Sequence, residues 1–84
     1  MLRLLGLRPG ERVLDLGCGP GLLALEMRAR VGEAGRVEGI DLSQSMLELA
    51  LRRCAGHANI GLRTGDVSAL PYADAAFDVG VCTQ

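Results

Sequence analysis

A short apolar segment that runs directly into a glycine-rich turn constrains the fold of this chain more than any other feature. Residues 12–16 read RVLDL, and residues 17–21 read GCGPG. An apolar run of this length is typical of a buried strand in a parallel sheet. Residues 22–31 then predict a helix whose last turn holds Arg28 and Arg30, since basic residues are favourable at the negative end of the helix dipole. The sequence therefore predicts a strand, a tight turn and a helix in succession.

The following segments repeat this alternation. Further strands are predicted at residues 36–41 (RVEGID), 60–64 and 77–82 (FDVGVC), and a second helix is predicted from a cap at Ser43 to about Arg53. Ser45 and Glu48 also fit the spacing of a capping box, which leaves the start of this helix open by two residues. The residues of this helix that are available for burial are Met46, Leu47, Leu49, Ala50 and Leu51.

The segments outside these elements are interpreted as one partial helix, a turn and a loop. Residues 1–7 are expected to end a helix closed by Gly6, a turn follows at 8–10, and residues 68–76 form a loop. Alternation of strands and helices in this order predicts an α/β fold with a parallel sheet and right-handed crossovers. The length of 84 residues is sufficient for one small domain.

Composition and charge argue against several kinds of partner. The net charge is −1, and the nine basic residues, all Arg, are scattered along the chain, so no basic stripe for a nucleic-acid backbone is present. One Phe and one Tyr leave few aromatic rings for stacking on bases. No apolar run approaches the roughly 20 residues of a membrane span, and the N-terminus does not have the layout of a signal peptide. We therefore expect a cytoplasmic protein that binds neither nucleic acid nor membrane.

The three cysteines are Cys18, Cys54 and Cys82. Their odd number and wide separation, without a CxxC pair, indicate neither a disulfide framework nor a metal site. We expect reduced thiols. The single histidine, His57, is interpreted as a solvent-exposed residue of the loop after the second helix.

Acidic residues recur where the predicted strands end. Asp15 and Asp41 lie at the ends of the first two strands, and Asp66 follows the third. Because the carboxyl ends of parallel strands share one edge of the sheet, where ligands bind in open α/β folds, these carboxylates are expected to line a pocket beside the glycine turn. Three of these features also have an interpretation that involves no ligand. The glycines can be only a tight turn, Asp41 a helix-capping acid, and Asp66 a turn residue after Gly65.

The turn and Asp41 have the spacing of a nucleoside-binding site. Glycines let a backbone approach a ligand closely, and the amides at the start of the following helix suit a negatively charged group. Asp41 lies 20 residues after Gly21, a usual distance for an acid that accepts ribose hydroxyls.

Four segments together resemble class I S-adenosylmethionine-dependent methyltransferases. Residues 13–21 (VLDLGCGPG) resemble the first motif of that family, residues 39–47 (GIDLSQSML) the second, and residues 65–82 (GDVSALPYADAAFDVGVC) the third and fourth. The resemblance is nearest to the small-molecule branch that includes ubiquinone/menaquinone and arsenite methyltransferases. It implies a Rossmann-like sheet with strand order 3-2-1-4 and flanking helices.

The resemblance also implies roles for individual residues with S-adenosylmethionine as the cofactor. The methionine part would face Asp15, Gly17, Cys18 and Gly19; the ribose would bind Asp41; the adenosine would lie between Leu42 and Met46; the adenine would meet Asp66 and the Val67 amide; and the sulfonium would lie beside Cys82. Met46 has a second interpretation as core filler of an amphipathic helix. No catalytic residue and no metal ligand is identified.

The expected function is methyl transfer from S-adenosylmethionine to a small-molecule acceptor. The family's sheet has more strands than this chain supplies, so residues 1–84 are expected to be the cofactor-binding portion of a domain whose C-terminal part is missing. The first alternative is a non-catalytic cofactor-binding or interaction module. An NAD(P)-binding Rossmann fragment fits less well, because its third glycine would fall on Leu22, and Asp15 and Asp66 would have no role.

A narrower hypothesis concerns two of the cysteines. If the first and fourth strands are neighbours, Cys18 and Cys82 approach each other near the cofactor and provide two thiols for a soft acceptor such as arsenic. The alternative, which we favour, is that both are small buried residues.

Overall fold

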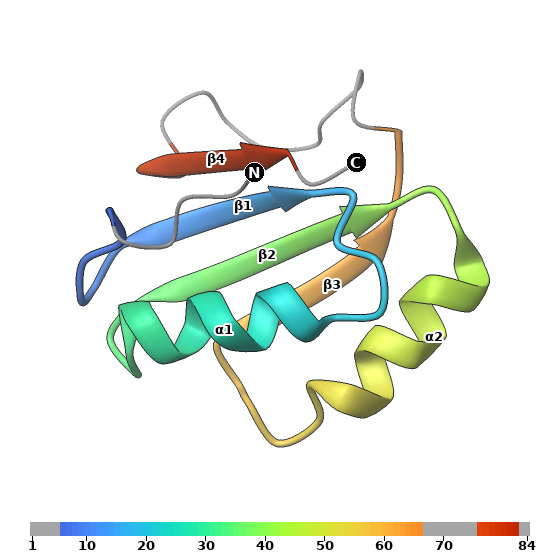
Figure 1. The fold of residues 1–84 in the computed structure, drawn as a ribbon, viewed down its shortest axis with the longest axis horizontal. Helices are drawn as coiled ribbons and strands as arrows, with labels where there is room; N and C mark the ends of the chain where they lie inside the picture. Colours follow the sequence, from blue (N-terminus) through green and yellow to red (C-terminus); the bar gives the residue numbers. More distant parts are fainter. Residues whose placement is uncertain (1–5, 67–75, 83–84) are drawn as a thin grey trace.

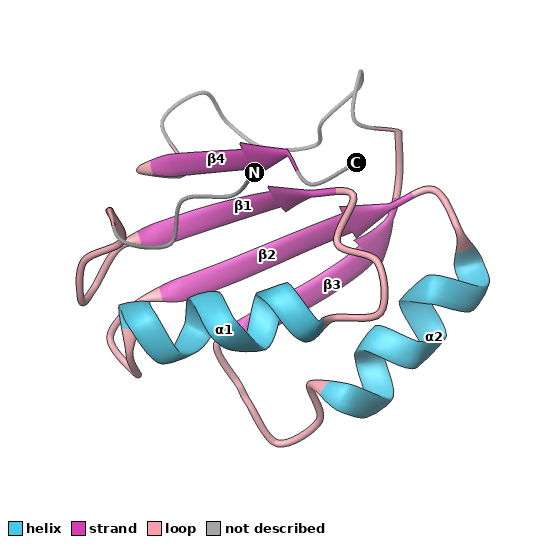
Figure 2. Cartoon of the chain, viewed as in Figure 1, coloured by secondary structure: helices cyan, strands magenta, loops and turns pink. Residues whose placement is uncertain are grey.

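The computed structural model describes residues 6–66 and 76–82, with Cys82 described by its backbone alone. In chain order the elements are β1 (Arg12–Leu16), α1 (Leu22–Val31), β2 (Arg36–Asp41), α2 (Gln44–Arg53), β3 (Ile60–Thr64) and β4 (Val79–Cys82). Figure 2 shows the two helices beside a single four-stranded sheet. The predicted bounds of the first three strands and of the first helix are confirmed.

The sheet has the predicted order, β3-β2-β1-β4, and every strand pair is parallel. In this register Asp15 of β1 lies between Gly39 of β2 and Val81 of β4. All four strands point in one direction in Figure 1, so their carboxyl ends meet at one edge, where the β1–α1 turn and the β2–α2 connection also lie. The topology therefore brings the ends of β1 and β2 together as the sequence analysis expected.

One face of the sheet carries the apolar core. Strand residues that alternate toward this face pack on α1 and on the end of α2, and the buried cluster comprises Val13, Ala24, Met27, Val31, Val37, Cys54 and Val81. Burial of a side chain such as Met27, which is fully inaccessible, contributes about 1.5–3 kcal/mol to stability. Neither of the described helices has the length and apolar content needed to cross a membrane.

The second helix buries fewer residues than its sequence suggested. Only Leu47 and Ala50 of the apolar positions in α2 are buried, whereas Met46, Leu49 and Leu51 are 39–49% exposed. The five apolar residues were predicted to be available for burial, and three of them are exposed because α2 packs on the sheet through one side only, against the edge strand β3 and its neighbour β2. The interpretation of Met46 as core filler is excluded for the same reason.

The start of α2 is resolved in favour of Ser43. Its side-chain oxygen accepts a hydrogen bond from the Met46 amide (3.3 Å), so Ser43 is the N-cap and the alternative start at Ser45 is wrong. The turn at residues 8–10 is confirmed by a hydrogen bond from the Glu11 amide to the Arg8 carbonyl (3.2 Å). The predicted helix before this turn and the predicted loop at 68–76 fall almost wholly outside the described residues.

Strand β4 begins at Val79, two residues later than predicted. The cause is Asp78, whose carboxylate accepts a hydrogen bond from the Arg12 amide (2.9 Å) while its own amide donates to the Arg12 carbonyl (2.8 Å). A side-chain oxygen thus replaces the carbonyl that a regular strand would offer to β1 at this position. The ladder therefore starts only after Asp78.

Candidate functional site

The glycine turn after β1 is anchored residue by residue to the end of β2. The amides of Gly17 and Cys18 both donate to the Ile40 carbonyl, at 2.7 and 3.0 Å. The next amide, that of Gly19, donates to Oδ2 of Asp41 at 2.8 Å. Gly19 has a φ of +56°, a left-handed conformation that residues with a side chain rarely adopt. The turn and the end of β2 therefore form one hydrogen-bonded unit.

Asp41 is oriented by two backbone amides. Besides the Gly19 amide on Oδ2, the Ser43 amide donates to Oδ1 at 2.8 Å, and the residue is only 7% exposed. Hydrogen bonds to a charged group contribute about 1.5–3 kcal/mol each. The interpretation of Asp41 as the helix cap is wrong, since Ser43 caps α2. The carboxylate instead joins the glycine turn to the start of α2.

Asp15 and Cys18 lie buried beside this unit. Asp15 is fully inaccessible and Cys18 is 4% exposed. Burial, reinforced by the negative charges of Asp15 and Asp41, raises the pKa of the Cys18 thiol to about 12. The thiol is therefore protonated at neutral pH and packs as a small apolar group. The hypothesis of a Cys18–Cys82 arsenic site is not tested, because the Cys82 side chain lies outside the described residues.

Gly21, at the end of the turn and the start of α1, lies against α2. It has a φ of +89°, and a Cβ at this position would lie 3.1 Å from Cα and Cβ of Ala50 and from Sγ of Cys54. Arg53 also donates from Nη1 to the Pro20 carbonyl at 3.0 Å. This close packing at Gly21 was not predicted from the sequence, although the last glycine of GCGPG was its visible signal.

The other predicted site residues are less enclosed. Leu42 and Met46 are 73% and 39% exposed, and Asp66 is exposed after Gly65, whose amide donates to the Asp41 carbonyl (3.2 Å). Cys82 pairs through its backbone with Leu16, and Val67 lies outside the described residues. The structure thus gathers five of the predicted residues into one cluster: Asp15, Gly17, Cys18, Gly19 and Asp41.

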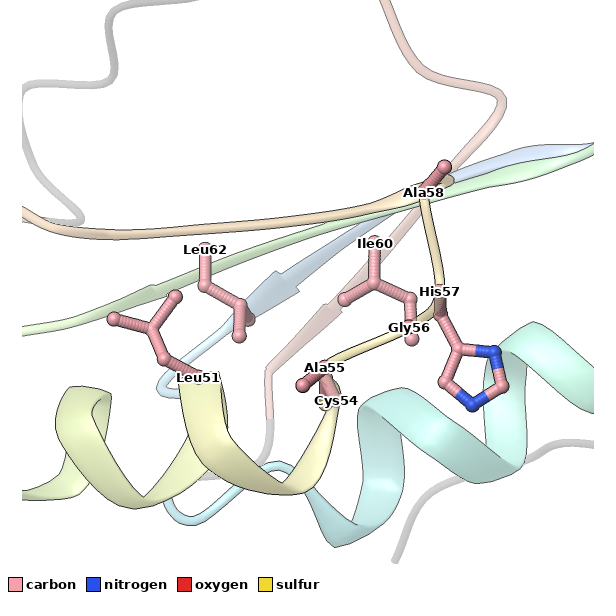
Figure 3. A pocket seen from close by; sticks show the side chains of 8 residues that line it. All are labelled: Leu51, Cys54, Ala55, Gly56, His57, Ala58, Ile60 and Leu62. Carbon is pink, nitrogen blue, oxygen red and sulfur yellow. The ribbon is translucent and has the colours of Figure 1, made fainter.

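A separate hollow of about 370 Å³ lies between α2 and β3. Its lining is Leu51, Cys54, Ala55, Gly56, His57, Ala58, Ile60 and Leu62. Figure 3 shows Leu51 and Leu62 at one end of the hollow and the His57 ring at the other. His57 lies in the predicted loop but is half-buried rather than fully exposed. Among the described residues, the lining of this hollow contains no carboxylate, and it lies around the start of β3, away from the acids at the carboxyl edge.

With this geometry established, comparison with known proteins identifies the family. A family model described as a methyltransferase domain matches residues 13–84. The chain belongs to this family. It is 42% identical over 74 residues to a demethylmenaquinone methyltransferase of Desulfitobacterium hafniense (strain Y51), an alignment that covers 84% of this chain and 29% of that protein.

Solved structures of methyltransferases share the fold. A SAM-dependent methyltransferase from Aquifex aeolicus superposes with a TM-score of 0.84 at 29% identity, covering 92% of this chain and 42% of that one. Fibrillarin from Aeropyrum pernix, in complex with natively bound S-adenosyl-L-methionine, gives a TM-score of 0.67 at 29% identity over 70% of this chain and 26% of that one. This methyltransferase domain therefore spans less than half the length of each of these relatives.

Proposed function

We propose that this methyltransferase domain binds S-adenosylmethionine at the carboxyl edge of its sheet and contributes the cofactor-binding portion of an enzyme that methylates a small molecule. The observation that carries the proposal is the buried Asp41 carboxylate, held by the Gly19 and Ser43 amides beside Asp15. Family membership and the cofactor named for the fibrillarin structure support it.

The chemistry of Asp41 fits a ribose. A carboxylate has about four lone-pair positions, and the two amides occupy two of them, which leaves acceptor capacity for two hydroxyl groups. No atom of the described residues lies within 4 Å of the position that a Cβ on Gly19 would occupy, which supports an opening for a ligand on that side of the turn. Asp15 toward the methionine part, and Leu42, Met46, Asp66, Val67 and Cys82 toward the nucleoside and sulfonium, stay predictions from the family resemblance.

The bound cofactor would supply a methyl group on a sulfonium. The described residues would bind the ribose, hold the turn in place and keep water away from the buried carboxylates, which is a contribution of positioning rather than of acid–base chemistry. A small-molecule acceptor is supported by the identity to the demethylmenaquinone methyltransferase. The cytoplasmic location remains a prediction from the sequence.

Calorimetric titration with S-adenosylhomocysteine tests the proposal. We expect saturable binding by the chain, no binding of NAD, and at least about 100-fold weaker binding by Asp41→Ala, because that variant loses two charge-assisted acceptor positions worth about 1.5–3 kcal/mol each. Asp78→Ala is the matched control, since it removes a carboxylate that also accepts a backbone amide but is exposed at the opposite end of the sheet.

Circular dichroism establishes that each variant is folded before titration. A folded chain that binds NAD but not S-adenosylhomocysteine would support the dinucleotide-binding alternative, and one that binds neither would contradict the proposal. We expect binding without appreciable methyl transfer by these 84 residues alone. Turnover with a panel of small acceptors would show that the domain needs no further segment.

A further inference from the structure

Gly39 lies in the middle of the buried strand β2, and the Cys18 side chain rests directly on it. A Cβ at residue 39 would lie 2.9 Å from Cβ and 3.2 Å from Sγ of Cys18. It would also lie 2.8 Å from Cδ2 of Leu62 in the neighbouring strand. Carbon atoms that are not bonded to each other make their favourable contacts at about 3.5–4.0 Å, so the bare backbone of Gly39 is what admits Cys18 here.

This contact lies beside the hydrogen bonds that join the glycine turn to the end of β2, at the edge where we propose cofactor binding. The Cys18 amide is bonded to the Ile40 carbonyl, and the next amide, that of Gly19, is bonded to the Asp41 carboxylate. The turn therefore touches β2 at consecutive residues, with the Cys18 side chain packed on Gly39. A larger residue at 39 would push this side chain away and lift the turn from the strand.

We infer that the packing of the Cys18 side chain on Gly39 sets the distance between the glycine turn and β2. Both are therefore positioning residues for cofactor binding. The inference rests on the proposed function. Cys18 acts through the volume of its side chain, since its buried thiol is protonated at neutral pH. Gly39 acts by having no side chain, so neither residue needs to touch the cofactor to control its affinity.

Gly61 provides a control that separates positioning from general packing. It lies in β3 and pairs with Glu38, and a Cβ on Gly61 would collide with the Glu38 carboxylate. Gly61→Ala therefore introduces a steric conflict into the same sheet, one strand farther from the turn, where the end of the flexible Glu38 side chain can move aside. It is expected to lower the stability of the chain without changing the distance between the glycine turn and β2.

The experiment combines affinity for S-adenosylhomocysteine with the rate at which Cys18 reacts with a thiol reagent, both measured well below the unfolding midpoint. Gly39→Ala is expected to weaken binding about tenfold or more and to accelerate Cys18 modification, whereas Gly61→Ala retains the native value of both. The double variant Cys18→Gly/Gly39→Ala should recover affinity relative to Gly39→Ala. Cys18→Ala/Gly39→Ala should not, because the 2.9 Å contact involves the Cβ that alanine keeps.

A third double variant tests the other steric contact. Leu62→Ala/Gly39→Ala removes the 2.8 Å conflict with Leu62, and we expect it to bind as weakly as Gly39→Ala. Recovery by this variant instead of by Cys18→Gly/Gly39→Ala would overturn the inference, as would native affinity in Gly39→Ala. If the unmodified chain does not bind S-adenosylhomocysteine, the proposed function fails. The rate of Cys18 modification then still tests the packing of Cys18 on Gly39, and an unchanged rate in Gly39→Ala would overturn the inference.

Discussion

The two ends of the sheet use the same interaction in opposite surroundings. At the carboxyl end, the Asp41 carboxylate accepts the Gly19 and Ser43 amides and is 7% exposed. At the amino end, the Asp78 carboxylate accepts the Arg12 amide and pairs with its guanidinium at 3.2 Å, with both side chains at least 40% exposed. A buried carboxylate that loses its donors pays the full cost of desolvation, whereas an exposed one is hydrated by water.

The difference in exposure gives the two carboxylates different structural consequences. Buried hydrogen bonds hold Asp41 and the turn in one geometry, as ligand recognition requires. The exposed pair between Arg12 and Asp78 connects the starts of β1 and β4 but tolerates rearrangement. Exposure, rather than the type of contact, therefore distinguishes the two ends, and the proposed binding site lies at the buried one.

The largest expected effect is on the reactivity of Cys18, at the carboxyl end. Because its pKa is raised to about 12, its thiolate fraction at pH 8 is about three orders of magnitude below that of an unfolded-chain cysteine with a pKa of about 8.5. Alkylation at Cys18, followed by mass spectrometry, should therefore be at least about 1,000-fold slower in buffer than in urea. The raised pKa also means that its contribution to stability is complete below about pH 8.5 and is lost as the pH rises toward 12. Equal alkylation rates in buffer and urea would contradict the burial of this end.

A pair of glycine substitutions compares the two ends at nearly the same backbone φ. Gly21, at the carboxyl end, has a φ of +89°, and Gly10, before β1 at the amino end, has a φ of +88°. Alanine in this conformation costs about 1–2 kcal/mol at either position. Gly21→Ala must also displace Ala50 or Cys54, which adds about 1–3 kcal/mol, whereas no atom in the described part of the chain lies within 4 Å of a Cβ on Gly10. Urea unfolding should show the larger loss for Gly21→Ala, and equal losses would refute close packing of α2 on the turn.

The smallest expected effect is that of Asp78→Asn at the exposed end. Hydrogen bonds from the Arg12 side chain, and then from its amide, lower the pKa of the Asp78 carboxyl in the folded protein. A lowered pKa contributes stability that is present above the unfolded value of about 3.9 and is lost as the pH falls through the folded value. The difference in thermal midpoint between the native chain and Asp78→Asn should therefore be small at pH 7, weaker in high salt and absent in strong acid. A difference that persists unchanged in acid would show that the charge of Asp78 does not matter.

Much of the fold was predictable because its signals are local. Glycines and apolar runs delimit β1, α1, β2 and β3, and the order of these elements predicts a parallel sheet that brings Asp15 and Asp41 to the same edge. The errors arose where a partner distant in the sequence intervenes. Asp78 delays β4 by bonding to Arg12, 66 residues away, and the position of α2 over β3 and β2 leaves Met46 exposed.

The sequence alone determined the succession of strands and helices, the glycine turn and the acids that end the strands, because strand and helix periodicity, turn preference and capping act over a few neighbouring residues. Only the tertiary structure decided which glycines lie in close contact with another segment. A Cβ on Gly39 would lie 2.9 Å from Cβ of Cys18, and a Cβ on Gly21 would lie 3.1 Å from atoms of Ala50 and Cys54. Such distances depend on how separate segments are stacked, and steric repulsion rises so steeply with approach that a few tenths of an ångström decide the outcome.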